Sequence, residues 1–158
     1  MPHPLKYAVV ESERRFLLRS MPTGVARTTE IVDRYLTGTR LRLREVTDPD
    51  GTVVRKLGHK VRLTDGPERV ACTSVYLDDA EWDVLRALPA RTLQKRRHHV
   101  HVGGVHVAVD ELPDGTLLAE VDGGEQPVTD VPSWLDVIRE VTNEEDWTGA
   151  ALAAADVS

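Results

Sequence analysis

The sequence predicts an α+β protein that is mainly β: a closed antiparallel barrel of eight strands, forming a tunnel, with flanking helices. Two observations predict this fold. Turn signals divide most of the chain into short segments in which apolar and charged residues alternate, the period of a strand. In these segments the charged residues share one face and the aliphatic residues the other. A sheet closed on itself can therefore place the charged faces inside.

The turn signals define the strands and make neighbours antiparallel. Asp48-Pro49-Asp50-Gly51 is the strongest, because proline presets one backbone dihedral and glycine accepts a positive φ. Residues 103–104 and 113–115 are further hairpin connections, while 21–29 and 64–67 are turn-rich. The expected strands are 7–18, two pieces of 30–46 joined near 36–39, 53–63, 69–77, 92–102, 105–112 and 117–122.

Helices are expected at three places. An aspartate pair at 78–79 caps a segment in which Trp82 and Leu88 share one helical face. Two more helices are expected near the carboxyl end, one over 133–140 and one from Glu144 onward. These helices, or a second subunit in a homodimer, could cover the apolar outer faces of the barrel.

Composition limits the class of protein. The 158 residues suit one domain over 1–158, and 41% hydrophobic content supports a folded chain. Aromatic residues make up 4% and the net charge is -6, which argues against nucleic-acid binding. The single cysteine, Cys72, fits a reducing, cytoplasmic compartment. No segment approaches the ~18 apolar residues of a membrane span, so no membrane association is expected.

Basic residues gather on single strand faces. They are Arg40, Arg42 and Arg44 on one strand, Lys56, Lys60 and Arg62 on the next, and Lys95 and Arg97 on a later one. Two unit charges ~6 Å apart cost roughly 3 kcal/mol at an effective dielectric of ~20, so these bases need compensation. We expect a ligand with several negative charges to supply it.

Acidic residues gather on two other strand faces. Glu11 and Glu13 share one face, and Glu120 and Asp122 share another. They are too few to neutralise the bases, and carboxylate oxygens suit divalent cations.

The order of these motifs resembles the CYTH superfamily, the triphosphate tunnel metalloenzymes. The first strand of that family carries Glu-x-Glu-x-Lys, which stands here as Glu11-Ser12-Glu13-Arg14-Arg15. The segment 39–44, Lys95-x-Arg97 and Glu120-x-Asp122 are further matches, and the resemblance covers roughly 7–147.

The resemblance implies a function and roles for residues. It implies metal-dependent hydrolysis of a triphosphate-containing small anion bound in a basic tunnel, with Mg2+ or Mn2+ as cofactor. Since few aromatics are available to hold a base, inorganic triphosphate is the expected substrate rather than a nucleoside triphosphate. By position, the resemblance implies that the metal ligands are Glu11, Glu13, Glu120 and Asp122. It implies that the catalytic residues are Glu11, Glu13 and Arg15. The phosphate-binding residues that it implies are Arg40, Arg42, Arg44, Lys56, Lys60, Arg62, Lys95 and Arg97. Arg15 replaces the motif lysine and stays protonated, so it could orient groups or stabilise charge but could not act as a base.

Two alternatives remain open. Cys72 and Ser74 stand where many family members carry further inward acids, which favours a module that binds a polyphosphate or nucleotide without turnover. The other alternative is a class IV-type adenylyl cyclase. The histidines at 98–101 and His106 are less consistent with a metal site than with a proton donor to a leaving phosphate.

Overall fold

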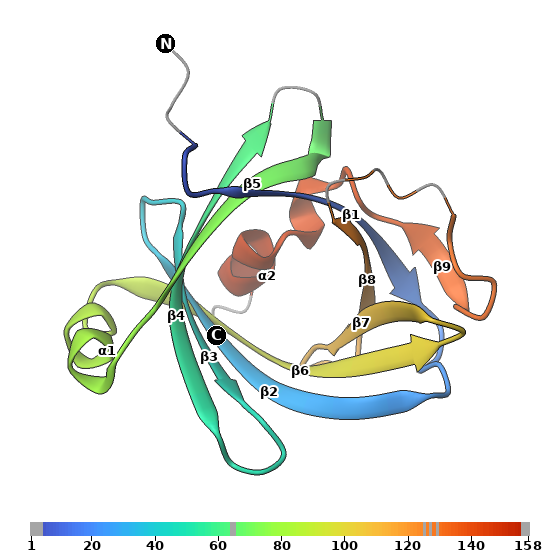
Figure 1. Ribbon diagram of the computed structural model, residues 1–158, viewed down its shortest axis with the longest axis horizontal. Coiled ribbons are helices and arrows are strands. Elements are labelled where there is room, and N and C mark those ends of the chain that lie inside the picture. The colour runs from blue at the N-terminus through green and yellow to red at the C-terminus, as the bar shows by residue number, and fades with distance from the viewer. Residues whose placement is uncertain (1–4, 64–65, 125, 127, 129, 156–158) are drawn as a thin grey trace.

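The strands close into an antiparallel eight-stranded barrel, as the sequence predicted (Figure 1). The computed structural model describes residues 5–63, 66–124, 126, 128 and 130–155. Residues 64 and 65 of the expected turn lie outside this part of the chain.

The elements follow one another as strands with three short helices. They are β1 (Val9–Leu18), β2 (Val25–Leu36), β3 (Leu41–Thr47), β4 (Val53–Leu63), β5 (Gly66–Tyr76), α1 (Asp79–Leu85), β6 (Ala90–Val102), β7 (Val105–Glu111), β8 (Leu117–Gly124), β9 (Val137–Glu140), the 3-10 helix η1 (Glu145–Trp147) and α2 (Gly149–Ala155). No helix in the described part of the chain is long and apolar enough to span a membrane.

Strand β1 closes the barrel. The strand order is β5-β4-β3-β2-β6-β7-β8-β1, and β1 pairs back with β5. Residues 9–12 of β1 pair with β5, whereas residues 12–18 pair with β8, with a register shift between Ser12 and Glu13. The seam of the barrel therefore lies beside the expected acidic motif.

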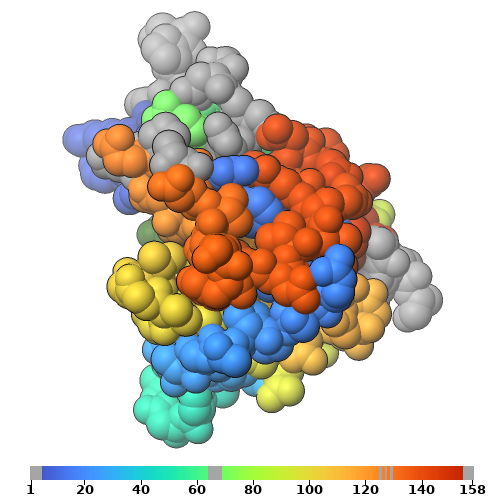
Figure 2. All heavy atoms as spheres, turned by 90° about the vertical axis from the view of Figure 1, so that its right-hand side faces the viewer, coloured from blue at the N-terminus to red at the C-terminus, as the bar shows by residue number. Residues whose placement is uncertain are grey.

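The apolar core lies outside the barrel wall, because the inward faces are largely charged. Val100, Val107 and Val109 point outward and are fully buried beneath the segment that contains Val128 and Leu135. In the side view, the orange and red carboxyl-terminal part of the chain covers much of β1 (Figure 2). This segment covers the apolar outer face of the barrel, which a barrel with a charged interior must shield from water.

Helix α1 covers the other apolar patch, as expected. Trp82 packs with Leu36 and Leu43, all three buried. The backbone N–H of Glu81 donates to Asp78 Oδ1 at 2.8 Å, and that of Asp78 donates to Glu81 Oε1 at 2.9 Å. This capping box explains why the helix begins at the aspartate pair.

Two local predictions were wrong. Residues 133–140 do not form a helix: their last four form β9, which pairs with 16–18 of β1. Adjacent β-branched Val137 and Ile138 favour a strand once an open edge is available. Residues 25–29, expected in turns, begin β2, which pairs with β6.

The last helix begins later than expected. It starts at Gly149 instead of Glu144, because the Thr148 hydroxyl caps it by accepting from the Ala151 N–H at 3.2 Å. Residues 145–147 before it form η1.

Helix α2 closes one end of the barrel. Its Ala153 is buried against Leu93 and Leu112, and Leu152 packs with Leu17 and Leu118. Leu17, Leu93 and Leu118 occupy inward strand positions, so this end is filled by apolar side chains.

Gly149 is needed where α2 meets the barrel. A Cβ at this position would lie 1.9 Å from the Tyr35 hydroxyl oxygen, at the end of a rigid side chain. We expect Gly149→Ala to destabilise the protein by about 1–3 kcal/mol through overpacking, measured by urea unfolding. Ala150→Ser, on the exposed side of α2, is the matched control and should change stability by less than about 0.7 kcal/mol. Equal stability of Gly149→Ala and wild type would contradict this seating of α2.

Candidate active site

Charged side chains from most strands of the barrel point inward. The inward set comprises Glu11 and Glu13 from β1, Asp33 from β2, Arg42 and Arg44 from β3, Lys56 and Lys60 from β4, Lys95 and Arg97 from β6, Asp110 from β7, and Glu120 and Asp122 from β8. Most of the predicted site residues are thus brought together in one interior.

Asp33 is the centre of the first buried ion-pair group. Its side chain is fully buried, and the Arg44 guanidinium donates to both carboxylate oxygens at 2.7 Å. Lys95 Nζ lies 3.7 Å from the same carboxylate. Burial by itself would raise the pKa of Asp33, but the Arg44 hydrogen bonds and the nearby positive charges together lower it.

Asp110 is the centre of the second group. It accepts from Arg97 Nε and Nη2 at 2.8 and 3.0 Å, and Lys95 Nζ lies 3.0 Å away. Burial opposes ionisation here too, yet Lys95 and Arg97 hold the pKa of Asp110 well below its usual range. Arg97 Nη2 also lies 3.4 Å from Glu120, which links this group to the acidic side of the barrel.

These pairs correct one expectation from the sequence. Part of the positive charge is compensated within the protein, because Asp33 and Asp110 form ion pairs with Arg44, Lys95 and Arg97. Asp110 was not assigned to the site from the sequence, and neither was Asp33. The place of Asp33 two residues from Ile31 and Tyr35, opposite Arg44 in the β2–β3 register, is the signal that could have identified it.

Cations with weaker or no carboxylate partners lie on β3 and β4. Arg42 Nε is buried without a hydrogen-bond partner in the described part of the chain, and its nearest carboxylate oxygen, on Asp33, is 3.9 Å away. Gly58 makes room for this guanidinium, since a Cβ there would lie 3.1 Å from Arg42 Nη2. Lys56 Nζ lies 5.9 Å from the Tyr76 ring centroid, and burial, then Arg44 and Arg42, lower its pKa. This part of the wall has cationic capacity left for an anion.

The acidic side of the barrel holds carboxylates close together. The charge of Glu120, followed by burial, raises the pKa of Glu13, while Lys60 and Arg15 act in the opposite direction. Glu11 accepts from the Cys72 thiol at 3.5 Å. Asp122 is exposed, and its Oδ1 accepts from the Gly124 N–H at 2.7 Å. Among the residues the structure describes, no three acidic, histidine or cysteine side chains form a ready metal cage.

Three predicted site residues have other contacts or are exposed, although Arg15 and Arg62 occupy inward strand positions. The Arg15 guanidinium donates to the carbonyl oxygens of Trp147 and Thr142. Arg62 pairs with Glu145 of η1, and Arg40 is exposed in the turn before β3. The catalytic role expected for Arg15 and the phosphate contacts expected for Arg40 and Arg62 remain predictions.

Solvent reaches the interior from the end opposite α2. Along β6 to β8, Lys95 and Asp110 are buried, Arg97 and Glu120 are partly exposed, and His106 and Asp122 are exposed. The interior therefore changes from apolar side chains at the α2 end, through charged groups in the middle, to polar side chains at the exposed end; we call this region the pit and its exposed end the mouth.

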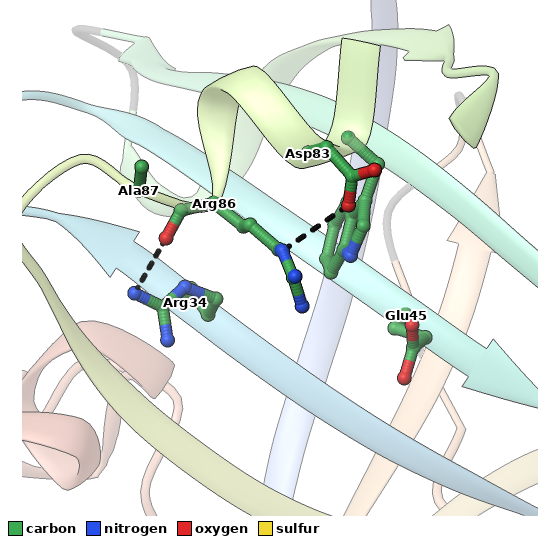
Figure 3. A pocket seen from close by; sticks show the side chains of 6 residues that line it. Arg34, Glu45, Asp83, Arg86 and Ala87 are labelled. Atoms are coloured by element: carbon green, nitrogen blue, oxygen red, sulfur yellow. Dashed lines mark hydrogen bonds and ion pairs between the residues drawn. The ribbon is translucent and has the colours of Figure 1, made fainter. Parts of the chain in front are cut away.

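A separate hollow lies outside the barrel beneath α1 (Figure 3). Its lining includes Arg34, Glu45 and Trp82. Arg34 donates to the Arg86 carbonyl at 3.0 Å, and Arg86 pairs with Asp83 at 3.3 Å. Because its arginines already contact groups within the hollow, the charged interior of the barrel is the stronger site.

Removing a buried carboxylate should lower the free energy of unfolding of the protein. Asp33→Ala leaves Arg44 buried without its partner, and we expect a loss of about 3–5 kcal/mol in urea unfolding. In the wild type, the contribution of Asp33 is present above its ordinary pKa of 3.8 and is lost as pH falls below it. Asp33→Asn should weaken that acid sensitivity. The control Asp136→Ala breaks the exposed pair with Arg19 and should cost at most about 1 kcal/mol.

Glu13 should behave in the opposite way. Its pKa is raised in the folded state, so its ionisation opposes folding above the ordinary value of 4.5. We expect Glu13→Gln to melt above wild type at neutral pH, by about 2–4 °C for each kcal/mol of repulsion removed, with the difference vanishing at acid pH. Asp146→Asn, in the exposed part of η1, is the control for simple loss of a negative charge. A Glu13→Gln variant less stable than wild type at neutral pH would contradict the carboxylate repulsion.

Comparison with known proteins shows the fold. No family model and no curated protein matches the chain. The crystal structure of the inorganic triphosphatase NE1496 is similar with 22% identity and a TM-score of 0.58, over 90% of this chain and 93% of that one. A second structure, of the hypothetical protein NE1496, gives 22% identity and a TM-score of 0.57, over 90% and 97%. The conserved hypothetical protein Pfu-838710-001 from Pyrococcus furiosus follows with 17% identity and a TM-score of 0.53, over 77% and 81%. The chain thus shares its barrel architecture with a structure described as an inorganic triphosphatase.

Proposed function

We propose that this protein hydrolyses a small triphosphate-containing anion, with inorganic triphosphate as the preferred substrate and Mg2+ or Mn2+ as cofactor. The observation that carries the proposal is the polarity of the interior. Arg42 and Lys56 retain cationic capacity on β3 and β4, while the like-charged Glu13 and Glu120 lie together on β1 and β8. In the strand order, β3 lies opposite β8 in the closed barrel, while β4 is separated from β1 by β5. The similarity in fold to the inorganic triphosphatase NE1496 supports the same proposal.

The cationic wall suits phosphate oxygens. A guanidinium binds phosphate through two parallel N–H donors, and Arg42 has a buried donor without a partner in the described part of the chain. Lys56 and Lys60 add point charges from β4. We assign these three residues to the oxygens of the substrate, with Arg44, Lys95 and Arg97 setting the surrounding positive field.

The acidic wall suits a divalent cation. Glu13 and Glu120 repel each other, so a bound cation would relieve an unfavourable contact, and oxygen ligands match Mg2+ and Mn2+. Glu11 and the exposed Asp122 complete the assigned ligand set. Such an ion would supply Lewis-acid stabilisation of the negative charge that develops during phosphoryl transfer.

A binding module without turnover is the second candidate. Ser74 and Cys72 face inward on β5, where acids that could hold a second cation or orient water would be expected from the family resemblance. Formation of a cyclic nucleotide from ATP would instead assign the chain to the adenylyl cyclases.

The test is phosphate release from inorganic triphosphate, pyrophosphate and ATP, with and without Mg2+ or Mn2+. We expect triphosphate to be hydrolysed fastest and only with a divalent ion. Glu13→Gln should reduce kcat at least about 100-fold while remaining folded.

Arg42→Ala should weaken triphosphate binding about 30-fold or more, the loss of roughly 2 kcal/mol from a charge-assisted contact.

Arg96→Ala is the matched control for Arg42→Ala. Arg96 points outward from β6 and pairs with Glu30, so its loss should leave turnover unchanged. If triphosphate raises the melting temperature of the wild type but no divalent ion gives turnover, the binding module replaces the hydrolase. If Arg42→Ala and Arg96→Ala affect triphosphate binding equally, the interior is not the binding site.

A further inference from the structure

Three histidines cluster at the mouth of the pit, outside the groups assigned above. His99 and His101 come from β6, and His106 from β7. His99 Nδ1 lies 3.2 Å from His106 Nε2, and the His101 and His106 rings are 4.6 Å apart between centroids. All three lie on inward strand positions, on the same wall as Arg97.

Arginines lie on two sides of this cluster. Arg27, whose guanidinium is 3.8 Å from Asp48 Oδ1, lies opposite His99 in the β2–β6 register, and Arg97, which pairs with Asp110, lies two residues along β6. Thr29 Oγ1 is 3.5 Å from His99 Nε2. The acids that act on the cluster are Asp110, which raises the pKa of His99, and Asp122, which raises that of His106.

The surroundings disfavour the protonated forms of His99 and His106 in the free protein. Burial, followed by Arg27 and Arg97, lowers the pKa of His99 to about 4. Burial, His101 and Arg97 lower the pKa of His106. A negatively charged group placed among these side chains would reverse the effect of the arginines, because a nearby anion favours the protonated imidazole.

A metal ion does not explain the cluster. One ring nitrogen each of His99 and His106 is engaged in the contact between the two rings. Arg27 beside them would repel a cation and attract an anion.

We propose that His99, His101, His106 and Arg27 form an outer anion subsite, which holds the end of a polyphosphate that projects from the pit and takes up a proton when it is filled. The inference rests on the proposed function, since it needs a polyanion bound in the interior. It adds a specificity element: a substrate long enough to reach the mouth gains contacts that a shorter phosphate chain lacks. It also predicts that binding tightens as pH falls from neutrality.

The test is isothermal titration calorimetry of the full chain with inorganic triphosphate. The Glu13→Gln background, without divalent ions, prevents turnover. Titrations in buffers of different ionisation enthalpy give the number of protons taken up on binding. The double change His99→Asn/His106→Asn should lower that number by about one and weaken binding about tenfold below neutral pH, with a smaller loss above it.

His98→Asn is the matched control. His98 points outward from the same strand and contacts Thr28 and Glu111, so its loss should leave proton uptake and affinity unchanged. The control also tests whether any histidine loss from β6 disturbs the barrel.

The outcomes separate the two proposals. Binding of triphosphate with the same proton uptake in the double variant and its parent would overturn the subsite alone. Failure of the parent to bind triphosphate would overturn the proposed function and the subsite with it. Stoichiometric Zn2+ binding that the double variant loses would assign the imidazoles to a metal and also overturn the subsite.

Discussion

The two buried carboxylates, Asp33 and Asp110, make this barrel possible. A closed sheet with arginines and lysines on its inner face would otherwise bury several like charges, each at a desolvation cost of several kcal/mol. Asp33 holds Arg44 through two hydrogen bonds, and Asp110 is shared between Lys95 and Arg97. The pairing links β2, β3, β6 and β7 through side chains as well as backbone. It fixes the positive groups in place.

The charged residues of the interior are of two kinds: those with close partners of opposite charge and those without. Arg44, Lys95 and Arg97 have short contacts with carboxylates and are structural as well as electrostatic. Arg42 keeps an unpartnered buried donor within the described part of the chain, and Glu13 is opposed by Glu120. Such unfavourable arrangements cost stability, and they concentrate where a ligand can relieve them. We therefore expect the functional site where charged side chains lack partners of opposite charge, and not simply where charged side chains are most numerous.

Much of the fold could be predicted from local sequence signals, whereas the buried ion pairs around Asp33 could not. Alternation and turns predict the eight barrel strands and the inward set around Arg42, Arg44, Lys95 and Arg97. Asp33 was missed because its segment carries only one inward acid, whose importance depends on the register with Arg44. The helix expected at 133–140 was wrong because β1 offers a partner edge more than a hundred residues earlier in the chain. The contacts of Arg15 with Thr142 and Trp147 are equally remote in sequence. Propensity and periodicity describe single segments, and neither can specify which distant segments meet.

Because charged residues face the interior and apolar residues face outward, the site depends on the carboxyl-terminal segment that follows β8. Because the inner face is charged, the barrel must bury its aliphatic residues on the outside, and residues after Val128 cover Val107 and Val109 there. The same segment then continues into β9, whose edge pairs with β1, and into α2, which fills one end of the interior. On the way it presents the two carbonyl oxygens that hold Arg15, a positive charge that acts on Glu13 from within the same strand. Folding of this segment therefore sets both the depth of the pit and the charge balance at its acidic wall. A change that loosens α2 should reach the carboxylate pair through Arg15, although no residue of α2 lies in the assigned binding set.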